Sequence, residues 1–164
     1  MLIFITIKCI VESEIAMSKS YDVRVVIILS DEFAKAVNKD GLQYAPAAEL
    51  APLKDVLATE KATLTNAMRD FEYYVQSSDA HGAAPSPIIE WSRDATKSDR
   101  AKMFYGPKFV VTLAAGTKVI DPALAARIKE KVEVLKGQGV VKDVRIDSMN
   151  PKKNPPIPRR YFGG

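Results

Sequence analysis

Histidine, cysteine and paired carboxylates carry much of protein catalysis, and this sequence offers few of them in useful patterns. The chain has one histidine and one cysteine. Because histidine titrates near neutral pH without help, most hydrolytic and acid–base sites depend on it. His81 lies beside Asp79 in a segment of small residues, which is typical of a histidine on an exposed surface. Cys9 lies in an apolar run without a neighbouring base, which favours an incidental thiol.

Metal and phosphate motifs are also lacking. A single cysteine excludes an intramolecular disulfide and a thiolate cluster built from this chain alone. The segment 115–118, AGTK, does not fit a phosphate-binding Walker loop, because Val111 stands where the first glycine belongs and Gly116 is followed by Thr117. An anion at the N-terminus of the following helix would be opposed by Asp121. We therefore expect a non-catalytic protein with no cofactor and no metal, although an enzyme built on carboxylates from distant segments stays open.

The charges of the chain are distributed unevenly. Residues 1–90 carry 8 Lys and Arg against 13 Asp and Glu, whereas residues 91–164 carry 16 against 7, within a total of +4. This asymmetry indicates either a polyanionic partner, most plausibly nucleic acid, or pairing of the two halves within the fold. The candidate binding residues are the grouped cations of the basic half: Arg93, Lys97, Arg100, Lys102, Lys108, Lys142, Arg145, Lys152, Lys153, Arg159 and Arg160.

Four segments of the first half predict structure that would position these residues. The β-branched run 22–29 predicts a strand buried on both faces, and 31–39 predicts a short helix after Ser30. Apolar residues at spacings of three, four and seven predict one long helix over 52–75, although Lys61 falls on its apolar stripe. Residues 77–87 are small and contain prolines, so we expect a loop.

The second half is expected to contain a strand, an exposed loop and a βαβ unit. Residues 88–91 predict an edge strand behind two prolines, and the polar run 92–102 predicts a hairpin loop. Residues 108–114 predict a central strand. In 140–146 apolar residues are interspersed with charged ones, which is typical of an edge strand. Between them, Asp121, Pro122 and Gly137 predict the start and end of a helix.

This order of elements predicts an α+β fold. Strand, helix, strand, strand, helix, strand is the ferredoxin-like βαββαβ plan, an antiparallel sheet with two helices on one face. In that plan the first and third strands are central, and here they are the apolar ones. RNA-recognition domains use such a sheet and stack bases on aromatics of these two strands. The first strand has no aromatic residue, so we do not expect that kind of domain.

The two ends of the chain differ from its middle. We expect a single α+β domain over residues 17–149, followed by a Pro-rich basic tail over 150–164 that is either solvated or packed through Ile157, Tyr161 and Phe162. Residues 1–16 are either an N-terminal extension from an upstream start site or an added edge strand. Their apolar run is interrupted by Lys8 and is too short to cross a bilayer, so we expect no membrane partner and a cytoplasmic protein.

Two functions from different classes follow. The first is a non-catalytic binding module whose basic C-terminal half contacts a polyanion, most plausibly nucleic acid. The alternative is an assembly or regulatory subunit that forms homo- or hetero-oligomers through its sheet, because the central strand 108–114 has apolar side chains on both faces.

Overall fold

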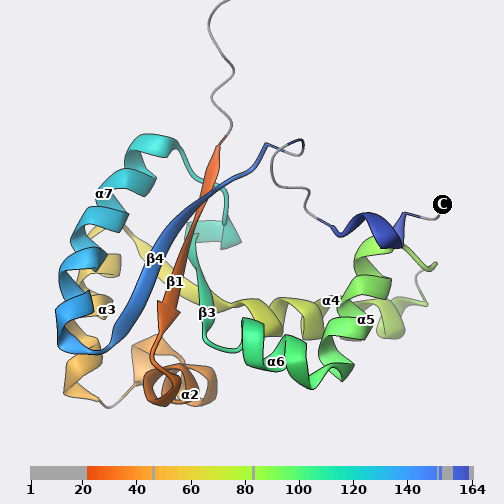
Figure 1. The fold of residues 1–164 in the computed structure, drawn as a ribbon, viewed down its shortest axis with the longest axis horizontal. Coiled ribbons are helices and arrows are strands. Elements are labelled where there is room, and N and C mark those ends of the chain that lie inside the picture. Colours follow the sequence, from red (N-terminus) through yellow and green to blue (C-terminus); the bar gives the residue numbers. More distant parts are fainter. Residues whose placement is uncertain (1–21, 46, 83, 151, 153–156, 163–164) are drawn as a thin grey trace, which may run out of the picture.

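The described residues form an α+β fold, with six α-helices and a four-stranded antiparallel sheet in the order β2–β3–β1–β4 (Figure 1). The computed structural model describes residues 22–45, 47–82, 84–150, 152 and 157–162. The strands are β1 (Val23–Leu29), β2 (Ala62–Asn66), β3 (Lys108–Leu113) and β4 (Val141–Ser148). The prediction that the apolar runs 22–29 and 108–114 form the two central strands is confirmed, as is the edge position of β4.

One face of the sheet packs against helices. α3 (Ala51–Thr59) and α7 (Pro122–Glu133) lie along this face, and α2 (Asp31–Asp40) closes one end of it (Figure 1). Alternate residues of β1 point into this core, and Val25, Ile27 and Leu29 are fully buried. Side chains alternate between the faces of a strand, so the residues between them face the other side of the sheet.

Helix α7 begins where the sequence places it. Asp121 accepts hydrogen bonds from the backbone amides of Ala123 and Leu124, at 2.9 and 3.0 Å, and Pro122 occupies the first turn. The helix continues as the 3-10 turn Val134–Gln138, and the chain leaves it at Gly139, with φ of 74°, two residues beyond the predicted exit. Shorter 3-10 turns cover Leu42–Tyr44, Ala48–Leu50 and Ala114–Gly116.

The prediction of one helix over 52–75 is wrong. α3 ends at Thr59, Lys61 takes a positive φ of 52°, and the chain then forms β2 before α4 (Ala67–His81) begins. Along the edge strand β2, the side chains of Thr63, Leu64 and Thr65 point alternately to the two faces of the sheet. Thr63 and Thr65 are β-branched, which favours a strand. Because the interruption redirects the chain, the apolar residues on either side of it enter two separate clusters.

The predicted strand 88–91 and hairpin loop 92–102 are also wrong, because both segments are helical. α5 spans Pro87–Lys97 and α6 spans Asp99–Tyr105. Pro87 occupies the first turn of α5, where its missing N–H costs nothing. The predicted loop 77–87 is helical as far as His81 and begins only after it.

The three helices between β2 and β3 have their own small core. Met68 and Phe71 of α4 pack with Ala95 of α5, and α4 to α6 extend from the sheet on the side away from α7 (Figure 1).

The predicted extension 1–16 lies outside the described residues, so neither of its two interpretations is tested. In the tail, residues 157–162 return to α5, where Arg159–Tyr161 form the 3-10 turn η5. Within the described part of the chain, no helix is both long and apolar enough to cross a membrane.

Candidate nucleic-acid interface

A pocket of about 830 Å³ lies where α5, α6 and the C-terminal segment meet. Four of its lining side chains are aromatic, namely Trp91, Phe104, Tyr105 and Tyr161. Arg100 and Arg160 also line it, and Asp94 contributes a carboxylate. Planar rings beside guanidinium groups suit a ligand that is both flat and anionic.

The aromatic side of the pocket is fixed from beneath by α4. Phe71, which is 6% exposed, meets the ring of Trp91 edge to face at 4.8 Å and that of Tyr105 at 5.1 Å. Phe104 in turn meets Tyr105 edge to face at 4.9 Å. Phe104 itself is 57% exposed, so its ring can accept a partner without rearrangement of the core. Burial is the main cause that raises the pKa of Tyr105, and its nearness to Tyr161 adds to the shift.

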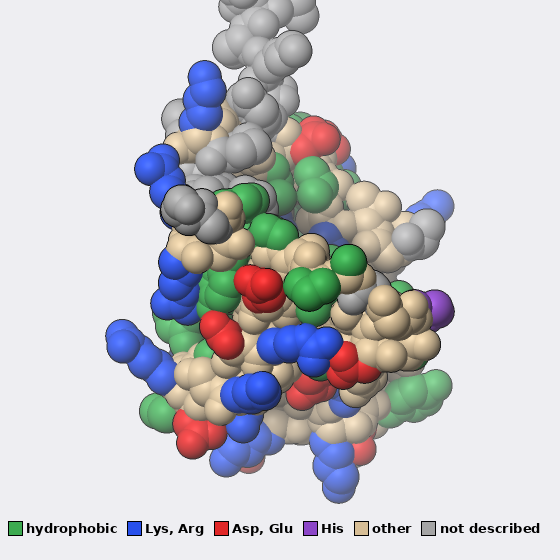
Figure 2. All heavy atoms as spheres, turned by 90° about the vertical axis from the view of Figure 1, so that its right-hand side faces the viewer, with side chains coloured by type: hydrophobic (Ala, Val, Ile, Leu, Met, Phe, Trp, Pro, Cys, Tyr) green, Lys and Arg blue, Asp and Glu red, His purple; other side chains and the backbone are tan. Residues whose placement is uncertain are grey.

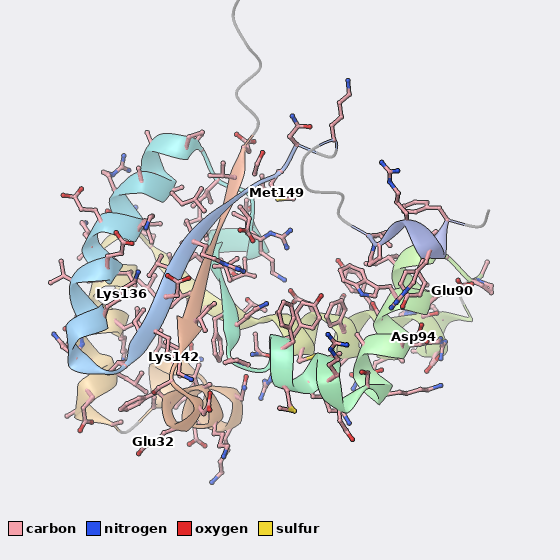
Figure 3. All side chains as sticks on the ribbon, viewed as in Figure 1. Glu32, Glu90, Asp94, Lys136, Lys142 and Met149 are labelled. Atoms are coloured by element: carbon pink, nitrogen blue, oxygen red, sulfur yellow. The ribbon has the colours of Figure 1, made fainter. Side chains whose placement is uncertain are left out.

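The C-terminal segment forms the opposite wall. The hydroxyl of Tyr161 donates to Oδ2 of Asp94 at 2.8 Å, and the guanidinium of Arg160 donates to the same hydroxyl at 2.8 Å. Arg160 also lies over the ring of Tyr161, 4.8 Å from its centroid. Asp94 is labelled on α5 in Figure 3, below the turn that carries Tyr161. Of the two alternatives for the tail, packing on its own domain is the one observed at Tyr161, whereas Phe162 is 59% exposed.

The fold brings six of the predicted cations to this region, four from α5 and α6 and two from η5: Arg93, Lys97, Arg100, Lys102, Arg159 and Arg160. Two are already paired, Arg93 with Asp79 and Lys102 with Asp99 at 3.4 Å. Lys97, Arg100 and Arg159 are exposed, and the described residues give them no ion-pair partner. These three are therefore the cations most available to a ligand.

The other predicted cations are spread more widely. Lys108 lies on β3 with its Nζ over the Phe104 ring that lines the pocket, 2.8 Å from the centroid, and Arg145 lies on β4. Lys142 pairs with Asp31 at 3.0 Å, at the opposite end of the molecule from Asp94 (Figure 3). Lys152 is exposed beyond β4. Lys153 lies outside the described residues, so its position is not tested.

Figure 2 shows the side of the molecule that carries α5 and η5. Lys and Arg side chains run down its left edge, whereas in its middle they lie among Asp and Glu side chains. This side of the molecule is therefore not uniformly positive. A ligand would have to be recognised by the rings of the pocket as well as by charge.

Sequence reasoning identified the cations of this region but missed the pocket. The sequence predicts a strand at Trp91 and a loop at Asp94. In the structure both residues lie on α5 and line the pocket together with Ala95 and with Ser98, the residue that follows the helix. The signal that could have found them is the spacing of Trp91, Ala95 and Ser98 at three to four residues, which fits a helix better than a strand.

His81 does not line the pocket. His81 is exposed at the end of α4, and its Nδ1 lies 2.8 Å from the carbonyl oxygen of Ser77. Within the described residues, no three His, Cys, Asp or Glu side chains are grouped to hold a metal ion. Cys9 lies outside those residues.

Comparison of the chain with protein-family models, with curated proteins and with solved structures finds no match in any of the three. What the chain binds must therefore be inferred from its own geometry.

Proposed function

We propose that the chain is a non-catalytic binding module whose basic C-terminal half contacts a polyanion, and that this polyanion is single-stranded nucleic acid. The observation that carries the proposal is the pocket between α5, α6 and η5, where aromatic rings and arginines line the same space. Unpaired bases stack on aromatic side chains while lysines and arginines contact the phosphates. A duplex offers no free base faces, so the exposed ring of Phe104 favours a single strand.

We also infer that the sheet belongs to the ferredoxin-like class, with α4, α5 and α6 inserted between its second and third strands. The strand order β2–β3–β1–β4 and the antiparallel pairing of all neighbours support this inference. The inserted helices α5 and α6 line the pocket. In this proposal the binding surface therefore lies on the inserted helices and not on the sheet.

The proposal is tested by fluorescence anisotropy with a labelled single-stranded oligonucleotide of about 20 nucleotides, titrated at several salt concentrations. The logarithm of the binding constant should fall linearly with the logarithm of the salt concentration, because cations released from the phosphates drive binding. Absence of binding, or binding that does not respond to salt, would reject the proposal.

Two substitutions localise the surface. Phe104→Ala should weaken binding by about tenfold or more, since stacking on one ring contributes roughly 1–3 kcal/mol. Arg100→Ala should weaken binding and reduce the salt slope by about one. Lys142→Ala is the matched control, because this lysine pairs with Asp31 away from the pocket. If Lys142→Ala weakens binding as much as Arg100→Ala, the pocket is not the binding site.

The alternative proposal is an assembly subunit that associates through its sheet. The edge strands β2 and β4 support it, because an edge strand has a row of backbone groups able to pair with another chain. The second face of the sheet supports it less, since its apolar residues Val26 and Val110 are 6% and 4% exposed within one chain. Light scattering that gives a monomer mass at working concentration would reject the homo-oligomer.

A further inference from the structure

Three cationic residues share the face of the sheet that is turned away from α3 and α7. In the sheet register, Val26 of β1 lies opposite Arg145 of β4 on one side and opposite Val110 of β3 on the other. Ile28, two positions along β1, pairs with Lys108. Arg24, two positions the other way, lies on the same face, because side chains of a strand alternate with a period of two.

Lys108 is buried without an anionic partner. Its side chain belongs to a residue only 9% exposed, and its Nζ lies over the ring of Phe104, 2.8 Å from the centroid. Among the described residues, Nζ has no hydrogen bond and no ion pair. A buried ammonium group is normally paired, since removing it from water is costly.

The pKa of Lys108 also reflects a shortage of negative charge around its amine. Burial, the largest cause, and the positive charge of Arg145 together lower the pKa of Lys108 to about 8, and Asp147 opposes this by less than Arg145 adds to it. In the register, Lys108 and Arg145 lie on either side of β1, opposite Ile28 and Val26. Two like charges therefore share one face of the sheet.

The acidic groups of this face do not neutralise it. Asp143 bonds to Lys136 at 3.1 Å, and Asp147, opposite Arg24 in the register, makes no ion pair within the described part of the chain. The Nε of Arg24 is buried and has no hydrogen-bond partner among the described residues. Within this part of the chain, the carboxylate of Asp147 therefore faces three cations that make no ion pair.

We propose that Lys108, Arg145 and Arg24 form a binding site for a phosphate group on this face of the sheet, over Val26 and Val110. A phosphate offers three acceptor oxygens, and guanidinium groups donate to it in pairs. The buried valines beneath and the Phe104 ring beside Lys108 give its ammonium group an apolar environment, which strengthens a charge-assisted hydrogen bond made there. The site adjoins the pocket between α5 and η5 at Phe104, which lines that pocket, and it does not rest on the proposed nucleic-acid function.

The test uses inorganic phosphate and the full chain labelled with ¹³C at the lysine ε carbons. The pH is titrated with and without phosphate, and the NMR signal of each lysine gives its pKa. The signal of Lys108 is identified as the one that disappears in Lys108→Met. Phosphate should raise the pKa of Lys108 by about one unit or more, because binding favours the charged amine. The signal of Lys142 is the internal control and should not shift. Chloride at the same ionic strength tests for screening, and acetate tests for carboxylates in general.

Calorimetry with phosphate then identifies the partners of Lys108. Arg145→Ala and Lys108→Met should each weaken phosphate binding at least about tenfold, the effect of losing one charge-assisted contact. Lys142→Met should leave it unchanged. An unshifted Lys108, the same shift with chloride or acetate, or equal weakening by Lys142→Met would each overturn the site. A phosphate response at Lys108 in a chain that binds no oligonucleotide would keep this site and reject the nucleic-acid proposal.

Discussion

Tyr161 donates a hydrogen bond of 2.8 Å to Asp94, and this contact joins the C-terminal segment to α5 across 67 positions of the chain. The same hydroxyl accepts from Arg160 at 2.8 Å. One phenol therefore holds the arginine, its own ring and the helix in a fixed arrangement. Because Pro158, Arg160 and Tyr161 of the segment line the pocket, the attachment of the segment decides whether the pocket has this wall.

Tyr161→Phe should loosen the C-terminal segment without unfolding the domain. The substitution removes the hydroxyl and both of its hydrogen bonds but keeps the ring in place. Amide hydrogen exchange of residues 157–162 should become faster, while global stability changes by less than about 1 kcal/mol, because these bonds are exposed to water. Tyr44→Phe, at a tyrosine that is 73% exposed, is the matched control. Unchanged exchange in Tyr161→Phe would show that the hydrogen bond does not hold the segment.

Asn66 should contribute more to stability than an ordinary helix cap. Its Oδ1 accepts from the amides of Met68 and Arg69, which caps α4, and its Nδ2 donates to the carbonyl oxygens of Gly106 and Lys108. The residue is 5% exposed, so its loss leaves buried groups without partners. Asn66→Ala should reduce the free energy of unfolding by about 2–4 kcal/mol, measured by urea denaturation.

Asp121→Ala is the comparison for Asn66→Ala. Asp121 caps α7 through two backbone amides but is exposed, and among the described residues its side chain makes no hydrogen bond or ion pair outside α7. Its loss should cost about 1 kcal/mol. Equal costs for the two substitutions would mean that the bonds from Asn66 to Gly106 and Lys108 add nothing.

The sheet-forming runs were predictable because each is strongly apolar and continuous. The segment 52–75 was not, because its apolar residues satisfy two structures at once. Leu53 and Leu57 fit a helical stripe that continues to Leu64. In the structure, however, α3 ends at Thr59, and Lys61, which lies in that stripe, has a positive φ. The alternation of Thr63, Leu64 and Thr65 gave a weaker signal of period two than the long helical pattern around it.

The candidate site was predictable in charge but not in shape. Helix α5 was missed because prolines before an apolar run suit both an edge strand and a helical first turn, and only packing against Phe71 decides between them. The placement of Lys108 and Arg145 on one face of the sheet, on either side of β1, depends on the register of three strands. No local sequence pattern encodes that register. The contact between Tyr161 and Asp94 likewise depends on tertiary structure alone.

Gly106 should not tolerate a side chain. A Cβ atom at this position would lie 2.6 Å from the carbonyl oxygen of Lys102, which belongs to the backbone of α6 and cannot move aside. Gly106→Ala should therefore reduce the free energy of unfolding by roughly 1–3 kcal/mol. At Gly137 a Cβ would meet nothing within 4 Å, so Gly137→Ala should be neutral or slightly stabilising. Equal effects of the two substitutions in urea denaturation would contradict the close approach at Gly106.

Lys108 should make the stability of the chain depend on pH. Its pKa in the folded chain is about 8, below the ordinary value of 10.5, because burial and Arg145 disfavour the charged amine. Below about pH 8 the folded chain therefore carries the full cost of the buried charge. Between pH 8 and 10.5 the folded amine is neutral while the unfolded one still binds a proton, so this cost is relieved and stability rises with pH.

Lys108→Met removes the charge and keeps an unbranched side chain against Phe104. In phosphate-free buffer it should raise the free energy of unfolding at pH 7 by about 1 kcal/mol, once screening by solvent is allowed for. Its advantage over the unsubstituted chain should shrink at pH 9.5, because there the native lysine has also lost its charge. Urea denaturation at both pH values measures the difference, with Lys142→Met as the control for titration of an exposed lysine. If Lys108→Met lowers stability at pH 7, contact of the ammonium with the Phe104 ring outweighs the cost of burial, and the unpaired charge is not a reason to expect an anion there.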